Sequence, residues 1–371
     1  MYKWTQWGAA VALAAALCGA GHAQILIGQT AGFSGQVAAG VKETTDGALL
    51  YIDAVNAKGG VNGQKIELIS LDDKFDPKLA AENARKLIEE GNVSALFLTR
   101  GTPHTEAIVP LLEKHGVALV GPSTGAMVLH QPVRKYIFNV RATYQREAEK
   151  AMTHLASMGI TRIAVVYADD SFGADGVAGA QKGLAAAKLT PVVLEKFDRA
   201  KPDFAPVAAK VAKADTQAVL MIASGSAVVD GSNALRGAGS AAQIVTLSNN
   251  ASGGFIKSLG NNARGVIVTQ VYPNERAVTY AMVKEAQELA RAKGLQEISP
   301  AMLEGFAAAK VLVEGLKRAG PKPSRDKIHA ALEGIKKFDL GGLEVSYGPD
   351  DHTGLDFADL SIIGTDGRFR R

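Results

Sequence analysis

Cysteine is nearly absent from this chain of 371 residues, because Cys18 is the only one. A single cysteine excludes an intramolecular disulfide. The residues before it, Ala15-Ala16-Leu17, do not form the Leu-x-Gly/Ala run of a lipobox, so no lipid anchor is expected. Tryptophan is limited to Trp4 and Trp7. Charge is balanced, with 41 basic and 37 acidic residues, and no Lys/Arg run forms a patch for nucleic acid or a membrane surface.

Long apolar runs are missing as well. A membrane-spanning helix needs about 18 consecutive apolar residues, and no segment supplies them, so no direct membrane insertion is predicted. The short apolar run Ala9 to Leu17 instead follows the basic Lys3 and precedes the small residues Gly21 and Ala23. This order is typical of a secretory signal peptide. We therefore expect residues 1–23 to be cleaved before Gln24 and the remaining chain to work in the periplasm.

Strand-like and helix-like segments alternate along residues 24–371, a length that suggests roughly two domains. Strands are predicted at 25–29, 65–71, 94–99, 117–121, 162–167, 192–196, 218–222, 244–247, 343–347 and 356–363. Helices are predicted at 41–57, 77–90, 103–115, 148–158, 173–187, 204–212, 229–237, 277–292, 300–319 and 325–335. Such alternation predicts an α/β fold with parallel sheets covered by helices on both faces.

Small polar residues follow five of the predicted strands. They lie in segments 100–102, 121–125, 169–173, 224–226 and 248–250. Open parallel sheets bind ligands beyond the carboxyl ends of their strands, and hydroxyl groups with backbone N–H groups suit a carboxylate. Each segment alone also fits a helix N-cap or a turn. Together they predict a shared ligand-binding cleft.

Five longer motifs add a family resemblance over nearly the whole chain after residue 23. They are IGQTAGFSG at 27–35, AKGGVNG at 57–63, DDKFDP at 72–77, GPSTGA at 121–126 and YADDSFG at 167–173. In this order and spacing, they resemble the type I periplasmic solute-binding proteins of ABC transporters, the group that includes the leucine/isoleucine/valine-binding proteins. The resemblance implies two α/β lobes joined by three hinge strands, which close over a small-molecule ligand and present it to a membrane permease.

The implied lobe boundaries are residues 24–143 with 272–350 for lobe 1, and residues 144–271 with 351–371 for lobe 2. Hinges are expected near 141–145, 270–274 and 347–354, in a protein that acts as a monomer.

The resemblance also implies site residues. The loops at Thr102 and at Ser123, Thr124 and Gly125 match those that hold a ligand carboxylate in the family. Phe172 matches an aromatic position, commonly Tyr, that closes on the ligand from lobe 2. The strand-end pattern adds Ser224, Ser226, Ser248 and Asn249 from lobe 2, and Tyr144 follows the first hinge.

The ligand class stays open between two alternatives. Amino-acid binders of the family often place an acidic residue for the ligand ammonium near the loop that here reads Ser248-Asn249-Asn250, which is neutral. Asp169, Asp170, Glu147 and Asp230 are the candidate substitutes, although each also fits a solvated surface position. The ligand is then either a branched-chain or other amino acid, or an aromatic or other amine-free carboxylate or an amide. A ligand sensor with the same fold is a further alternative.

An enzyme is the less favoured interpretation. Gly121-Pro122-Ser123-Thr124-Gly125 matches the Gly-x-Ser-x-Gly pattern of a hydrolase nucleophile, but Pro132 and a strand-like run at 136–140 follow where a supporting helix should lie. The histidines lack the spacing of a metal-ligand pair. No Walker A or Gly-x-Gly-x-x-Gly motif follows a strand. We therefore expect neither a catalytic residue, nor a metal site, nor a cofactor.

Overall fold

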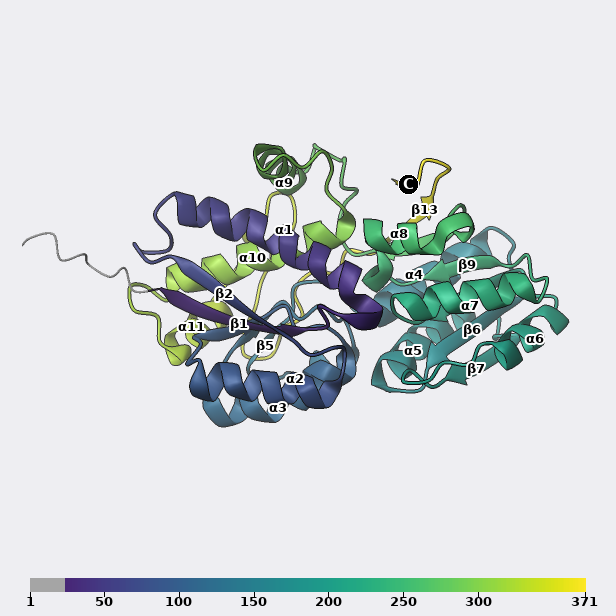
Figure 1. Ribbon diagram of the computed structural model, residues 1–371, viewed down its shortest axis with the longest axis horizontal. Helices are drawn as coiled ribbons and strands as arrows, with labels where there is room; N and C mark the ends of the chain where they lie inside the picture. Colours follow the sequence, from purple (N-terminus) through teal and green to yellow (C-terminus); the bar gives the residue numbers. More distant parts are fainter. Residues whose placement is uncertain (1–23) are drawn as a thin grey trace, which may run out of the picture.

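The computed structural model describes residues 24–371, so the predicted signal peptide, with Cys18, Trp4 and Trp7, lies outside the described residues. Two α/β lobes lie side by side (Figure 1). Each lobe is built on its own sheet, and the parallel strands with flanking helices confirm the predicted fold class. Within residues 24–371, none of the helices combines the length and the apolar character needed to cross a membrane.

Lobe 1 contains a five-stranded parallel sheet in the order β2-β1-β3-β4-β5. Its strands are β1 (Ile25–Ala31), β2 (Ile66–Asp72), β3 (Ala95–Phe97), β4 (Leu119–Val120) and β5 (Ile137–Phe138). One face packs on α1 (Ala38–Ala57), α9 (Ala281–Ala292), α10 (Pro300–Arg318) and α11 (Arg325–Glu333). The other face packs on α2 (Pro77–Arg85), its π-helical extension η2 (Lys86–Glu90), and α3 (Thr102–His115). A short hairpin of β11 (Phe338–Asp339) and β12 (Glu344–Val345) completes the lobe.

Lobe 2 contains seven strands in the order β14-β13-β10-β9-β8-β6-β7. Five of them are parallel: β6 (Ile163–Ala168), β7 (Val193–Phe197), β8 (Ala218–Ile222), β9 (Gln243–Thr246) and β10 (Ile267–Gln270). The last two, β13 (Asp359–Ile363) and β14 (Phe369–Arg370), are antiparallel. The helices of the lobe are α4 (Tyr144–Ser157), α5 (Ser171–Ala186), α6 (Ala205–Lys213), α7 (Ser226–Gly237) and α8 (Gly253–Leu259). Together these elements enclose a single hydrophobic core.

Side-chain caps explain why several helices begin earlier than the apolar periodicity predicts. Thr143 accepts a hydrogen bond from Arg146 N at 3.1 Å, so α4 begins at Tyr144 rather than at residue 148. Asp170 accepts from the N–H groups of Phe172 and Gly173, so α5 begins at Ser171 rather than at residue 173. A capping oxygen satisfies N–H groups that the first turn leaves free, and it thereby fixes the helix start.

Some predicted elements are shorter than expected, and some elements of the structure were not predicted. Residues 277–280 form turns in front of α9, with Ala277 N bonded to Asn274 O and Tyr280 N bonded to Ala277 O. The predicted strand 343–347 contains only the two residues of β12. Three elements were not predicted: α8, β11 and β14. They are short, and α8 begins with two glycines, so neither propensity nor periodicity marks them.

Helices α1 and α10 touch backbone to backbone inside lobe 1. A Cβ atom at Gly47 would lie 2.0 Å from Met302 O, and one at Gly305 would lie 1.8 Å from Thr44 O. Glycine at both crossing points therefore permits this close packing. The contact fixes the position of Glu304, the neighbour of Gly305, whose carboxylate lies 3.9 Å from Arg141 in the first crossing segment.

The chain passes between the two sheets three times: after β5, after β10 and after β12. The carboxyl ends of the parallel strands in the two lobes face one another across the resulting cleft. Hydrogen bonds between lobes span it, for example from Arg100 Nη2 to Asn249 O at 2.5 Å. The lobes are thus in contact, in an arrangement that we call the closed form.

Candidate ligand-binding site

Arg100 lies where the two lobes meet, three residues after the end of β3. It pairs with Ser123 in an isolated parallel bridge, and its Nη1 donates to Ser123 Oγ at 2.9 Å. Its Nη2 donates to the Asn249 carbonyl of lobe 2. The side chain is buried, and burial lowers the pKa of the Arg100 guanidinium. Among residues 24–371, no carboxylate oxygen lies within 4.0 Å of this cation, so neutral groups are its hydrogen-bond partners.

The predicted hydroxyl residues of lobe 1 are all buried, and Ser123 is the one that contacts this guanidinium among the described residues. Thr102 opens α3, and its Oγ1 lies 2.7 Å from Thr124 Oγ1, so the two side chains share a hydrogen bond. Thr102, Ser123 and Thr124 are each at most 2 % exposed. Gly125 has a different environment, because a Cβ atom there would lie 2.6 Å from Ala142 O in the first crossing segment. The structure therefore brings Thr102 and Thr124 together and places Ser123 on Arg100, while Gly125 packs against the first crossing segment.

A buried ion pair forms the base of the cleft. Arg141 follows β5 and donates from Nη2 to Glu147 Oε1 and, at 2.7 Å, to Ser248 Oγ. Glu147 Oε2 accepts from Ser248 N at 2.9 Å and from Thr269 Oγ1. Burial would lower the pKa of Arg141, but the adjacent Glu147 carboxylate raises it above its ordinary value. The pair ties the first crossing segment to the ends of β9 and β10.

Further polar atoms in the same region have no hydrogen-bond partner. Among residues 24–371, the buried atoms without a partner include Arg141 Nη1, Tyr272 OH and Glu304 Oε1. Glu304 Oε1 lies 3.9 Å from Arg141 Nη1, beyond hydrogen-bond distance. Burial and then the Glu304 charge raise the pKa of Tyr272 well above its ordinary value. We refer to these buried groups as the polar cluster: Arg100, Arg141, Glu147, Tyr272 and Glu304.

Aromatic rings close one side of the cluster. Tyr144 packs edge to face on Phe172, with ring centroids 4.9 Å apart, and the Arg141 guanidinium lies 4.5 Å from the centre of the Tyr144 ring. Burial raises the pKa of the Tyr144 hydroxyl. Arg199 of lobe 2 lies between Phe172 of its own lobe and Phe75 of lobe 1, at 5.5 Å and 5.3 Å from the ring centres. Phe172 therefore lies at the junction of the lobes.

The lobe 2 residues predicted from the strand ends divide into two groups. Ser248 and Asn249 are buried, and Asn249 Nδ2 donates to Ser224 Oγ at 2.9 Å, so these three line the cleft together. Ser226 is exposed at the start of α7. Together with Asn249, it lines a cavity of about 320 Å³ between α1 and lobe 2, which also reaches Arg100. Arg100 is the one charged side chain lining this cavity among residues 24–371.

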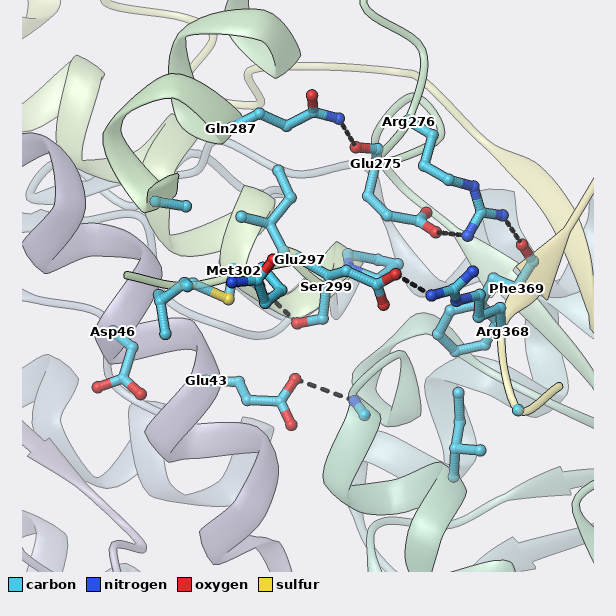
Figure 2. Close-up of a pocket in the computed structure, with 18 of the residues that line it drawn as sticks. Glu43, Asp46, Glu275, Arg276, Gln287, Glu297, Ser299, Met302, Arg368 and Phe369 are labelled. Carbon is cyan, nitrogen blue, oxygen red and sulfur yellow. Dashed lines mark hydrogen bonds and ion pairs between the residues drawn. The ribbon is translucent and has the colours of Figure 1, made fainter. Parts of the chain in front are cut away.

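A larger pocket of about 640 Å³ lies elsewhere along the seam between the lobes (Figure 2). We call it the outer pocket. It is lined by α1, α9 and the start of α10 from lobe 1, and by α8 and β14 from lobe 2. Two ion pairs lie in it: Glu275 pairs with Arg276 at 3.2 Å, and Glu297 pairs with Arg368. None of the predicted site residues lines it.

The sequence-based analysis missed the charged residues of the polar cluster. The expectation that Glu147 is a solvated surface charge is wrong, because the side chain is fully buried against Arg141. The sequence did contain a signal for Glu304, because it is the single charged residue in the otherwise uncharged segment 300–309. All ten residues of this segment are buried in the structure. The other acidic candidates lie apart from the cluster: Asp170 caps α5 and pairs with Arg199, Asp169 pairs with Lys196, and Asp230 is exposed.

Ser123 does not have the surroundings of a nucleophile. Its Oγ accepts a hydrogen bond from Arg100, a permanently charged donor. Within residues 24–371, no histidine nitrogen is hydrogen-bonded to it, whereas a serine nucleophile needs an adjacent base. The segment that follows contains only the short 3-10 turn η3 (Met127–Leu129).

The fold and the polar cleft define a two-lobed α/β binding protein. A family model described as periplasmic binding protein matches residues 24–357, so the chain belongs to the periplasmic binding protein family. It is 25% identical over 341 residues to the Leu/Ile/Val-binding protein BraC3 of Rhizobium johnstonii, covering 88% of each chain.

Two crystal structures show the same architecture. A substrate-binding periplasmic protein from Ralstonia solanacearum has a TM-score of 0.84 and 31% identity, over 93% of this chain and 99% of that one. A possible leucine/isoleucine/valine-binding protein from Rhodopirellula baltica has a TM-score of 0.87 and 25% identity, over 94% and 97%. These findings confirm the predicted family.

Proposed function

We propose that this protein captures a small carboxylate-bearing solute between its lobes and delivers it to the permease of an ABC importer. It would act in the periplasm as a monomer after removal of residues 1–23. One observation carries the choice of a carboxylate: the Arg100 guanidinium is buried at the meeting point of the lobes and has only neutral partners.

Burying a charge away from water costs free energy. A buried cation without a counter-ion is unfavourable, and a carboxylate that accepts paired hydrogen bonds from a guanidinium is the strongest common partner for it. The Ser123 hydroxyl contacts Arg100, and it can add a further donor for the carboxylate. Since both lobes contact Arg100, ligand binding there would select the closed form that the permease recognises.

For the rest of the ligand, we propose an amino acid with an uncharged side chain. The unpartnered Glu304 Oε1 supports an ammonium group, since it supplies the carboxylate that the loop at 248–250 lacks. Apart from Arg100, the residues that line the cavity of about 320 Å³ are uncharged, which suits an uncharged ligand side chain. BraC3 carries a Leu/Ile/Val-binding name, which agrees with this class. An amine-free carboxylate or an amide is the alternative.

The test is a thermal-shift screen of residues 24–371 with amino acids, amine-free carboxylates and amides, followed by calorimetry on the solutes that bind. Arg100→Met should weaken binding of a carboxylate at least about 30-fold, because it removes a buried charged partner. Arg264→Met, at an exposed arginine of lobe 2, is the control and should leave affinity unchanged. Glu304→Gln should weaken binding only if the ligand carries an amine. Binding that survives Arg100→Met would refute the carboxylate assignment.

A further inference from the structure

Glu43 of α1 reaches across the seam between the lobes. Its Oε2 accepts a hydrogen bond from Gly253 N at 3.0 Å, and its Oε1 accepts from Gly254 N at 2.8 Å. Figure 2 shows the carboxylate directed at the start of α8. The next N–H, that of Phe255, is satisfied within lobe 2 by Ser252 Oγ at 3.1 Å. Lobe 1 thus supplies the acceptors for two backbone donors of lobe 2.

These hydrogen bonds exist only while the lobes touch. A Cβ atom at Gly254 would lie 2.6 Å from the Ala39 Cβ, so α8 is packed tightly on α1 at this point. Hydrogen bonds lose most of their strength when the donor and acceptor move beyond about 3.5 Å, so even a small opening breaks both. In the open form, Glu43 and the two N–H groups would bond to water instead.

Glu43 also lies apart from the proposed ligand. It lines the outer pocket, whereas the polar cluster and the cavity beside Arg100 are formed by other residues. We propose that Glu43 is a closure residue that sets ligand affinity through the closed form, without touching the ligand. This inference rests on the proposed function, because affinity is its main readout.

The size of the effect follows from a two-state argument. If the ligand binds only the closed form, the apparent dissociation constant rises in proportion as the closed fraction falls. Charge-assisted hydrogen bonds are among the stronger ones in proteins. Glu43→Ala should therefore weaken affinity about tenfold, mainly through faster dissociation. Glu43→Gln, which retains one acceptor oxygen without the charge, should have a smaller effect in the same direction.

Asp46 provides a matched control, since it lies on the same helix and lines the same pocket. It pairs with Lys42 of its own helix at 2.6 Å and makes no hydrogen bond to lobe 2 among the described residues. Asp46→Ala removes the same charge without touching the seam. We expect its affinity to remain within about twofold of the parent protein, as is usual for an exposed pair.

A second measurement is independent of any ligand. Residues 24–371 contain no cysteine, so spin labels can be attached through Glu113→Cys in α3 and Lys213→Cys in α6, both exposed positions on opposite lobes. The distance distribution of the ligand-free protein reports the closed fraction. Glu43→Ala should shift it toward longer distances, and Asp46→Ala should not.

The outcomes separate this inference from the proposed function. Weaker binding together with a longer distance in Glu43→Ala alone supports the closure role. Equal behaviour of Glu43→Ala and Asp46→Ala in both measurements refutes it. If the screen finds no solute at all, the proposed function fails, and the label distances alone still decide whether Glu43 holds the closed form.

Discussion

The polar cluster and the outer pocket lie on the same seam but differ in how their polar groups are satisfied. The outer pocket has about 640 Å³ of space, and several of its charged groups already have partners: Glu275 pairs with Arg276, Glu297 pairs with Arg368, and Glu43 accepts from backbone N–H groups. The polar cluster lies in a tighter region, yet it holds buried atoms without partners. Buried polar groups are nearly always hydrogen-bonded, so the gathering of three unpartnered atoms, Arg141 Nη1, Tyr272 OH and Glu304 Oε1, agrees with the ligand position that we propose. Cavity size and unsatisfied hydrogen bonds thus favour different regions of the seam.

The largest expected effect concerns the ion pair at the base of the polar cluster. Glu147→Gln removes the carboxylate nearest to the buried Arg141 and leaves only Glu304 Oε1, 3.9 Å from Arg141 Nη1, as a counter-ion, so the free energy of unfolding should fall by about 3 kcal/mol. Glu149→Gln, two residues further along α4, is the control, since Glu149 pairs with Lys182 on the surface at 2.8 Å. Urea unfolding of both variants tests this prediction. If Glu147→Gln is no more destabilising than Glu149→Gln, the pair does not support the fold.

A change at Gly225 should break closure itself. A Cβ atom there would lie 1.8 Å from Gln36 O of lobe 1, so Gly225→Ala should force the lobes apart. Gly260→Ala is the control, because it introduces the same backbone strain without the clash. Gly260 has φ 53° and ψ −125°, close to φ 53° and ψ −123° at Gly225. A Cβ atom at Gly260 would meet no atom within 4 Å. Both variants should lose about 1–3 kcal/mol of stability through strain.

Only Gly225→Ala should lose ligand affinity, by about tenfold or more, since the ligand is expected to require the closed form. Calorimetry with a solute from the screen measures this difference. Equal affinities of the two alanine variants would show that closure at Gly225 does not contribute to binding.

A smaller, pH-dependent effect is expected at Asp175, where α5 of lobe 2 meets Met127 of lobe 1. Burial raises the pKa of Asp175 from 3.8 to about 6, despite hydrogen bonds from Gln145 and Met127. Between these values, the unfolded chain releases the proton while the folded protein keeps it, so stability falls as pH rises. Asp175→Asn removes this loss. Its free energy of unfolding should therefore rise relative to that of the parent protein by on the order of 2 kcal/mol between about pH 4 and pH 7.

The histidines of lobe 1 titrate in the opposite sense. Burial lowers the pKa of His104 and of His130 from 6.5 to about 4, so their contribution to stability falls as pH decreases through this window. The parent protein and the Asp175→Asn variant both contain His104 and His130. The difference in their stability at each pH therefore reports on Asp175 alone. A constant gap between Asp175→Asn and the parent protein across this range would contradict the raised pKa.

The sequence predicted the parts of the molecule that depend on local patterns. Apolar runs identified β6 and β8 because buried parallel strands are continuously hydrophobic. The strand-end rule identified two segments, 100–102, which contains Arg100, and 121–125, which contains Ser123. The role of Arg100 could not be predicted, because it depends on which groups lobe 2 brings to it. Glu147 was misassigned for the same reason, since Ser248, one of its partners, lies 101 residues away in the chain.

The smallest effect is expected at the Glu297–Arg368 pair, which crosses the outer pocket between the lobes (Figure 2). Its side chains are 58% and 51% exposed, so water and salt screen the attraction. Arg368→Gln should change affinity by no more than about twofold, as is usual for surface ion pairs. A double-mutant cycle with Glu297→Gln measures their coupling. Glu43 lines the same pocket, but it accepts hydrogen bonds from backbone N–H groups where α1 and α8 are in tight contact. We therefore expect Glu43→Ala to weaken ligand affinity more than Arg368→Gln does. The opposite order would show that surface charge, and not the bonds of Glu43, mainly controls closure.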